Sequence, residues 1–247
     1  MPRLIPFRPA AACALALIAV LVPATAAVAK GPLVDLRVVG SGGKLLTERS
    51  VGAATTSIRT SPKATCFGAG TGGSGKSVTI KGPTALGVLG TAAKGTAALR
   101  PLLVTDAFDF GLGLCGIGGS SASMKLSWYL KVNHVDPELG GEAVKLKKGD
   151  EVLWALAAFP YPDELALVAP DRVKAGTPFK VRVFSYDGKG KRKPLAGAKV
   201  SGAAGRTGAD GRATVRLRKP ARLIARHGKA IPSNREAVCV GGKCPRG

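Results

Sequence analysis

The chain has 247 residues, and its 37 Lys and Arg outnumber its 15 Asp and Glu to give a formal net charge of +22. Hydrophobic residues make up 45% of it, yet no stretch after the first 29 residues is continuously apolar enough to cross a bilayer. A membrane-spanning protein is therefore excluded. The length is ample for one hydrophobic core and more comfortable as two.

The first 29 residues have the features of a secretory signal peptide. Arg3 and Arg8 supply the positive region, residues 10–22 form a short apolar run, and residues 24–29 contain two overlapping small-x-small cleavage sites. Cleavage after Ala29 would leave 218 residues. Cys13 begins the apolar run rather than ending it, which argues against a lipid anchor. We therefore expect a secreted protein, held at the cell envelope, if at all, by non-covalent contacts.

Charge divides the remaining chain into two parts. Residues 30–170 contain 15 Lys and Arg against 11 Asp and Glu, whereas residues 171–247 contain 20 against 4. A strongly basic module attracts polyanions. Outside the cell, an anionic envelope polymer or surface component is the expected partner. The basic segment 189–194 lacks the interleaved aromatics of single-strand binders, so it predicts a solvated hairpin loop and no specific nucleic acid.

Four cysteines follow the predicted leader, and an even number in an exported chain indicates disulfides. One pairing keeps each bridge within one segment of similar composition, although the other two pairings remain open. A zinc site is disfavoured because the first two cysteines stand alone and the chain has only two histidines. The favoured bridges are Cys66–Cys115 and Cys239–Cys244.

The stretch from Gly70 to Ser77, GTGGSGKS, has the spacing of a phosphate-binding loop. Such a loop follows a buried strand and opens a helix, whose N-terminus completes the anion site. Here Val78 and Ile80 alternate with polar residues, and Pro83 would stop a helix after little more than one turn. The sequence therefore predicts a glycine-rich turn followed by a strand.

Hydrophobic periodicity predicts one helix among several strands in the first part. Strands are expected over 33–40 and 45–52, joined by a turn at 41–44, and again at 78–80, 125–133 and 151–159. Between them, Thr84 is an N-cap candidate, apolar residues recur at helical spacing, and Pro101 closes the segment. The order predicts a sheet that grips a single helix.

The end of this part also resembles a known family. Trp128, the Val132-Asn133 pair and the strand from Lys145 to Trp154 are similar to the closing hairpin of the transcobalamin-like C-terminal domain family. The resemblance covers roughly residues 32–159. It implies a β-grasp-like domain over 30–159, and it raises corrinoid or other small-molecule binding as an alternative function.

Beyond a proline-containing linker at 160–164, short strands alternate with turn signals every 8–12 residues, which is typical of a β-sandwich. The segments AGAKV and TGADGRATV resemble bacterial Ig-like and carboxypeptidase-regulatory-like modules. The resemblance implies an Ig-like domain over 165–247. The predicted fold class is thus mainly β with one helix, a β-grasp-like domain followed by an all-β sandwich.

No arrangement of residues in the sequence indicates catalysis, a metal or a cofactor. His134 and His227 are interpreted as solvated turn residues. The carboxylates Asp136, Glu138 and Glu142 surround Gly140-Gly141 and are interpreted as a solvated loop, although a spaced acidic pair is the pattern of glycosidases. The residues expected in the core and those expected to contact a ligand are, respectively, Trp128 and Trp154, and Tyr129 and Asn133.

Together these features predict an exported, non-catalytic binding or display protein acting at or near the cell envelope. The alternative is a protein that binds a small, corrinoid-like molecule. A concave apolar pocket lined by Tyr129 and the Gly111–Gly119 loop would favour the alternative. A close group of histidine, carboxylate and hydroxyl would favour an enzyme.

Overall fold

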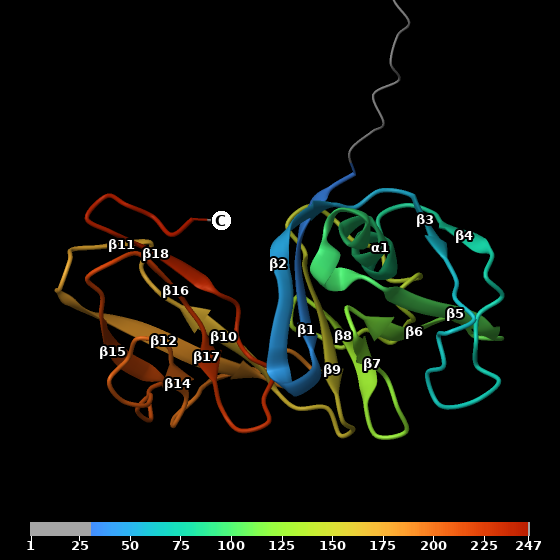
Figure 1. The fold of residues 1–247 in the computed structure, drawn as a ribbon. Coiled ribbons are helices and arrows are strands. Elements are labelled where there is room, and N and C mark those ends of the chain that lie inside the picture. Colours follow the sequence, from blue (N-terminus) through green and yellow to red (C-terminus); the bar gives the residue numbers. More distant parts are fainter. Residues whose placement is uncertain (1–30, 247) are drawn as a thin grey trace, which may run out of the picture.

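The computed structural model describes residues 31–246, so the predicted leader, with Cys13 and the cleavage site, lies outside the described residues. The chain is mainly β with one α-helix, as predicted. Its strands gather into two halves that lie side by side (Figure 1). In the described range, no helix is long and apolar enough to cross a membrane.

A mixed four-stranded sheet forms the centre of the first half. Its order is β2-β1-β9-β8, in which β1 and β9 are parallel and the other neighbours are antiparallel. The predicted turn between the first two strands is a short 3-10 segment, η1, where Gly42 and Gly43 have positive φ. The strands are β1 (Leu33–Gly40), β2 (Lys44–Gly52), β8 (Ser127–Val132) and β9 (Glu151–Ala157), and η1 is Ser41–Gly43.

The single helix, α1 (Ala85–Gly95), begins where its cap predicts. The Thr84 hydroxyl accepts a hydrogen bond from the Gly87 backbone N–H at 3.1 Å. The helix ends at Gly95, earlier than the predicted stop at Pro101, and a short 3-10 turn, η2 (Ala97–Leu99), follows. Trp154 joins helix to sheet, because its indole N–H donates to the Ala85 carbonyl at 3.3 Å. Trp128 and Trp154 are both buried, as predicted.

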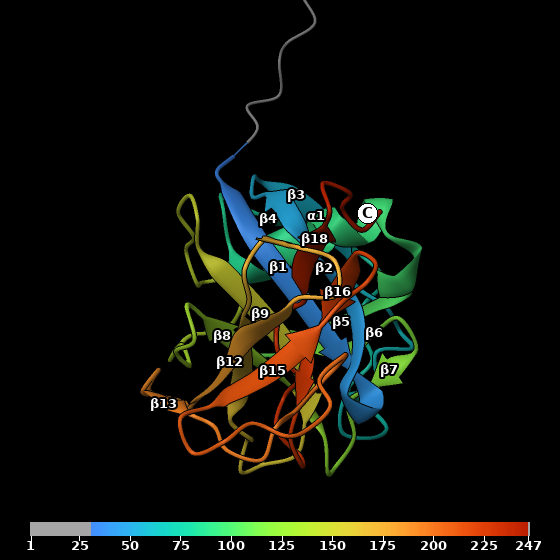
Figure 2. The same cartoon turned by 90° about the vertical axis from the view of Figure 1, so that its left-hand side faces the viewer.

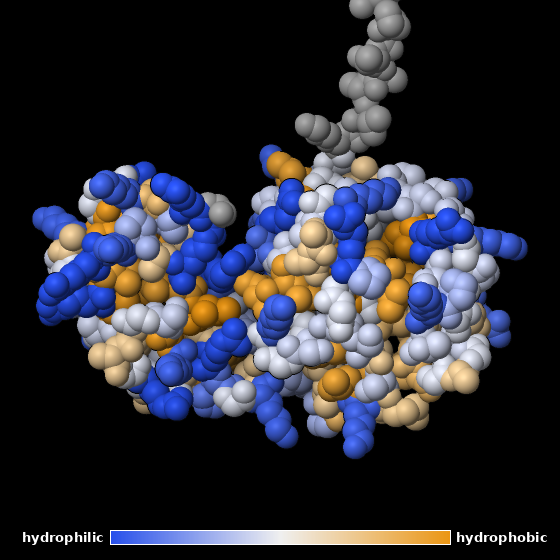
Figure 3. All heavy atoms as spheres, viewed as in Figure 1, coloured by the Kyte–Doolittle hydropathy of each residue, from blue (hydrophilic) through white to orange (hydrophobic). Residues whose placement is uncertain are grey.

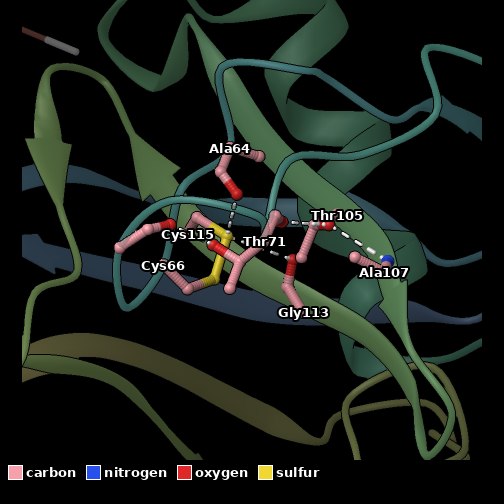
Figure 4. The surroundings of a disulfide bond; sticks show 8 residues. Ala64, Cys66, Thr71, Thr105, Ala107, Gly113 and Cys115 are labelled. Carbon is pink, nitrogen blue, oxygen red and sulfur yellow. Dashed lines mark hydrogen bonds between the residues drawn. A yellow bond between two sulfur atoms is a disulfide. The ribbon is translucent and has the colours of Figure 1, made fainter.

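Two smaller sheets complete the first half. They are made of β3 (Thr56–Arg59) with β4 (Ser77–Ile80), and of β5 (Leu102–Phe108), β6 (Gly111–Ile117) and β7 (Ser120–Ser121). The Cys66–Cys115 disulfide ties the loop after β3 to β6 (Figure 4). Beside it, the buried Thr105 hydroxyl donates to the Thr71 carbonyl at 2.6 Å, which holds the same loop against β5.

The glycine-rich stretch is a loop that runs into a strand, as predicted. Ser77 is the first residue of β4, so no helix N-terminus faces the loop. The carboxylate of Asp106 accepts from the Ser74 backbone N–H at 2.7 Å and from the Ser74 hydroxyl at 2.6 Å. These hydrogen bonds lower the pKa of Asp106. A carboxylate therefore occupies donors that a phosphate would need.

The second half is a sandwich of short strands. One sheet pairs β12 with β10, β13 and β15, and another has the order β11-β18-β16, with β14-β17 as a separate pair. Buried Val, Leu and Ala side chains between these sheets form a core of their own. The strands are β10 (Glu164–Val168), β11 (Arg172–Val173), β12 (Pro178–Tyr186), β13 (Arg192–Pro194), β14 (Lys199–Val200), β15 (Arg212–Arg216), β16 (Ala221–Leu223), β17 (Ala225–Arg226) and β18 (Glu236–Val240).

The central sheet of the first half is covered on both faces. One face carries Leu36, Leu130 and Trp154 and packs with α1 in the larger core. On the opposite face, Val39, Tyr129, Leu153 and Ala155 form a small cluster with Ile231 of the second half. The sheet is thus sandwiched between its own helix and the second module, which joins the two halves through an apolar contact.

The second disulfide, Cys239–Cys244, lies at the end of the second half, so both favoured pairings are confirmed. The two bridges close loops of very different sequence separation, 49 and 5 residues. Since loop-closure entropy grows with loop length, Cys66→Ser/Cys115→Ser should lower the free energy of unfolding by about 4 kcal/mol, and Cys239→Ser/Cys244→Ser by about 2 kcal/mol. Urea unfolding of both double variants measures this. Equal losses would contradict it.

Candidate functional site

A buried group of charges joins the two modules. The carboxylate of Glu164, at the start of β10, is 2% exposed and bonds to the Arg37 guanidinium of β1. Its other oxygen lies 3.0 Å from Nδ1 of His134 and 3.7 Å from Nζ of Lys131. Lys131 also donates to the Asp187 carbonyl at 2.7 Å. Three cationic or titratable groups of the first module therefore converge on one carboxylate of the second.

The prediction that His134 is a solvated turn residue is wrong. The residue does sit in a turn, with φ of 68°, but its ring stacks on Tyr186 of β12 at a centroid distance of 3.8 Å. Its second nitrogen lies 3.5 Å from a carboxylate oxygen of Glu151. The partners of the ring come from the far module, which no local sequence pattern reveals. His227, by contrast, is exposed, as predicted.

Burial acts against these charges, and their mutual contacts restore the balance. Burial tends to raise the pKa of Glu164, but the hydrogen bond with His134 and the charges of Arg37, His134 and Lys131 outweigh it, so the pKa is lowered. Burial lowers the pKa of Lys131. The group resembles a perturbed catalytic site in composition. However, both Glu164 oxygens are engaged, so we interpret it as the ionic joint between the modules.

Removing the central carboxylate tests this joint. Glu164→Ala leaves Arg37 and Lys131 buried without their counter-charge, and should lower the free energy of unfolding by about 3–5 kcal/mol. Glu138→Ala removes an exposed carboxylate and should change it by less than about 0.5 kcal/mol. Chemical unfolding near pH 7 measures both. A loss for Glu164→Ala no larger than that of the control would contradict the joint.

The lowered pKa of Glu164 also fixes the sign of a pH effect. Its ordinary value is 4.5, so its stabilising contribution is complete above that pH and is lost as the pH falls below it, through the lower pKa of the folded state. Glu164→Gln should flatten the fall in stability below pH 4.5. Unfolding measured at a series of pH values reports this, and parallel curves for the variant and the unaltered chain would contradict it.

Tyr129, expected to be exposed, is 5% exposed, and that expectation is wrong. The segment after β9 turns back over β8, so Tyr161 stacks on Tyr129 with the ring centroids 4.1 Å apart. The Tyr129 hydroxyl donates to the carboxylate of Asp136, and burial together with this carboxylate raises its pKa above the ordinary range. It therefore remains a protonated donor. Tyr129 does lie on the opposite side of the strand from Trp128, as predicted.

Asn133 is exposed but closes a turn with both ends of its amide. Its Nδ2 donates to Asp150 at 3.0 Å, and its Oδ1 accepts from the Glu151 backbone N–H at 2.9 Å. Its φ of 50° is one that asparagine tolerates better than most residues. These contacts account for an asparagine here, and its role as a ligand contact stays a prediction.

A groove of about 520 Å³ opens on the first module beside Tyr129. Phe67, next to the Cys66 disulfide, and Leu139, in the loop after β8, stand on its wall with exposed fractions of 48% and 62%. Phe110, in the turn between β5 and β6, is 84% exposed and stacks on Phe108 at 4.9 Å. The groove also takes in Leu112, Gly113, Leu114, Trp128, Trp154 and Tyr161.

Polar groups are few in this groove. The hydroxyls of Ser127 and Tyr161 lie 2.6 Å apart, and Asp136 accepts from Tyr129. The indole N–H of Trp128 is buried and has no hydrogen-bond partner among residues 31–246. An apolar wall with a small set of polar groups is the usual composition of a ligand site. The groove therefore suits a molecule with a flat apolar part and few hydrogen-bonding groups.

The three carboxylates predicted to form a solvated loop have separate environments. Glu138 is exposed, as predicted, whereas Asp136 and Glu142 are partly buried. Glu142 accepts from the Leu112 backbone N–H at 2.9 Å, and its other oxygen is buried without a partner in the described range. Over residues 31–246, no three His, Cys, Asp or Glu side chains come together as a metal site.

A scan against protein-family models finds no match, and a search of curated proteins finds none either. The transcobalamin-like and Ig-like resemblances therefore stay predictions. What the protein does is inferred from its own residues.

Proposed function

We propose that this chain is an exported, non-catalytic binding protein whose first module holds a small molecule in the aromatic groove. The observation that carries the proposal is the gathering of exposed Phe67, Phe110 and Leu139 around one concave surface. Soluble proteins rarely leave large apolar side chains exposed together unless that surface meets a ligand or partner.

Two features of the groove favour a small ligand over general display. Its volume of about 520 Å³ falls within the range of small-molecule sites. Tyr129 and three residues of the Gly111–Gly119 loop, Leu112, Gly113 and Leu114, contribute to its wall. This is the arrangement that the sequence analysis set as the condition for the small-molecule alternative. We therefore place ligand binding ahead of display alone.

The wall also narrows the class of ligand. Aromatic rings bind flat apolar surfaces by stacking, which favours a ligand with a planar or ring-shaped face. The hydroxyls of Ser127 and Tyr161 can each exchange a hydrogen bond with a polar substituent. Asp136 disfavours an anionic group nearby. A corrinoid, implied by the family resemblance, is one ring-shaped candidate and is tested below with cobinamide.

The second module supplies the proposed attachment to the envelope. Hydrophilic side chains project from its rim in the view of Figure 3, and its surplus of Lys and Arg attracts anionic surfaces at long range. Because the ionic joint at Glu164 holds it against the first module, the groove would be presented at the surface to which the second module binds.

The groove is tested with N-phenyl-1-naphthylamine, an uncharged flat probe whose fluorescence rises in apolar surroundings. Phe110→Ala removes an exposed ring from the wall and should weaken binding about five- to tenfold, or about 1–1.4 kcal/mol. Both tryptophans of the chain contribute to the groove, so their fluorescence should change on binding. Cobinamide is titrated in the same way.

Met124→Ala is the matched control, since Met124 is 81% exposed and does not line the groove. Its affinity for the probe should equal that of the unaltered chain. Absence of probe binding, or equal losses in the two variants, would reject the groove as the site. Binding of cobinamide that depends on Phe110 would favour the corrinoid alternative, and binding of the neutral probe alone would remove it.

A further inference from the structure

We propose that the outer face of the β12–β13–β15 sheet binds a linear phosphate-bearing polymer, with Arg182 and Arg192 as its central contacts. The inference deepens the proposed envelope attachment, and rests on it, by naming one face and one chemistry. Figure 2 shows β12 and β15 on the side of the molecule that faces the viewer. Alternate residues of both strands, Val181 and Val183 on β12 and Ala213 and Val215 on β15, point into the sandwich core.

The opposite positions on these strands carry cations. Lys180 and Arg182 stand on β12, and Arg212 and Arg216 stand on β15. Arg182 is paired directly across the strands with Arg212. Like charges directly opposite each other destabilise a sheet. Asp210, at 3.2 Å from Arg212, offsets one of them. The fold therefore gains nothing from this concentration of charge, which points to a partner outside the chain.

Two of the arginines are held in place by one aromatic ring. Phe184 of β12 is 8% exposed, and the guanidinium carbons of Arg182 and Arg192 lie 4.8 Å and 4.6 Å from its centroid. Cation–π stacking engages the flat faces of the guanidinium groups and leaves their N–H edges free. Arg182 spends only Nε, on the Asp210 carbonyl at 3.0 Å. Within residues 31–246, no hydrogen bond engages Arg192.

This arrangement suits phosphate. Guanidinium edges bind phosphate through pairs of parallel hydrogen bonds. Both groups lie within 5 Å of the same ring, so one anion can accept from the two together. A phosphate has more accepting oxygens than a carboxylate and can satisfy two such forks at once. Neighbouring strands and alternate residues place the other cations about 5–7 Å apart, which extends the site along a chain of repeated charges.

The test uses the full two-module chain and inorganic polyphosphate, titrated by calorimetry over a salt series. Arg182→Gln/Arg192→Gln should weaken binding at least about tenfold and lower the slope of log affinity against log salt by about two. Lys199→Gln/Lys229→Gln, which removes two exposed charges from other parts of the module, should weaken it less than about threefold. Arg182→Lys/Arg192→Lys keeps the charge and should still lose most of the affinity.

Several outcomes would overturn the inference. One is equal loss in the two Gln double variants, which would leave the general attraction of the proposed function standing and remove the specific face. Another is full binding by the Arg→Lys variant. Tighter binding to polyglutamate of matched charge, or to vesicles of anionic phospholipid, than to polyphosphate would reject a phosphate polymer as the partner. The groove is read out separately, because N-phenyl-1-naphthylamine carries no charge.

Discussion

The carboxylate of Glu164 is the contact on which the arrangement of this protein depends. It is buried at the boundary between two sets of strands and is bonded by Arg37 and His134 of the other module, with Lys131 nearby. A buried carboxylate without such partners would be protonated or would not be tolerated. The charges therefore permit only an orientation in which all these groups meet, and the apolar cluster around Ile231 packs in that same orientation.

This fixed orientation has consequences for function. The groove belongs to the first module, but Tyr161, which stacks on Tyr129 and lines the groove, lies three residues before Glu164. Any loosening of the joint would be transmitted to that ring. The arginine face lies on β12, whose last residue, Tyr186, stacks on His134. The joint thus adjoins both proposed binding surfaces and holds them in one geometry, which suits a protein that presents a bound molecule at a charged surface.

Much of the fold follows from local patterns in the sequence. Alternation in residues 33–40, the Thr84 cap with its apolar repeat, and the placing of the cysteines within two segments predict β1, α1 and both disulfides. The burial of Trp128 and Trp154 follows from the same periodicity. These features depend on near neighbours, or on pairing within one segment, and so can be read from the chain.

Contacts between distant segments could not be predicted in this way. Alternation separates the two faces of β1 and β8 but does not say that the second face is also covered, so Arg37 and Tyr129 were assigned to a polar or exposed side. Their coverings come from Glu164, Tyr161 and Ile231. The groove was anticipated only through Tyr129 and the Gly111–Gly119 loop. Phe67, Phe110 and Leu139 lie in loops without periodicity, and only the fold brings them together.

The most direct test of this account is backbone ¹⁵N relaxation of the two-module chain at neutral pH. If the Glu164 joint unites the modules, amides in β1, β8 and β9 and amides in β12, β15 and β18 will report a single overall tumbling time, that of the whole chain. Two different and shorter tumbling times would show modules that move independently. That result would contradict the claim that one rigid body carries both proposed surfaces.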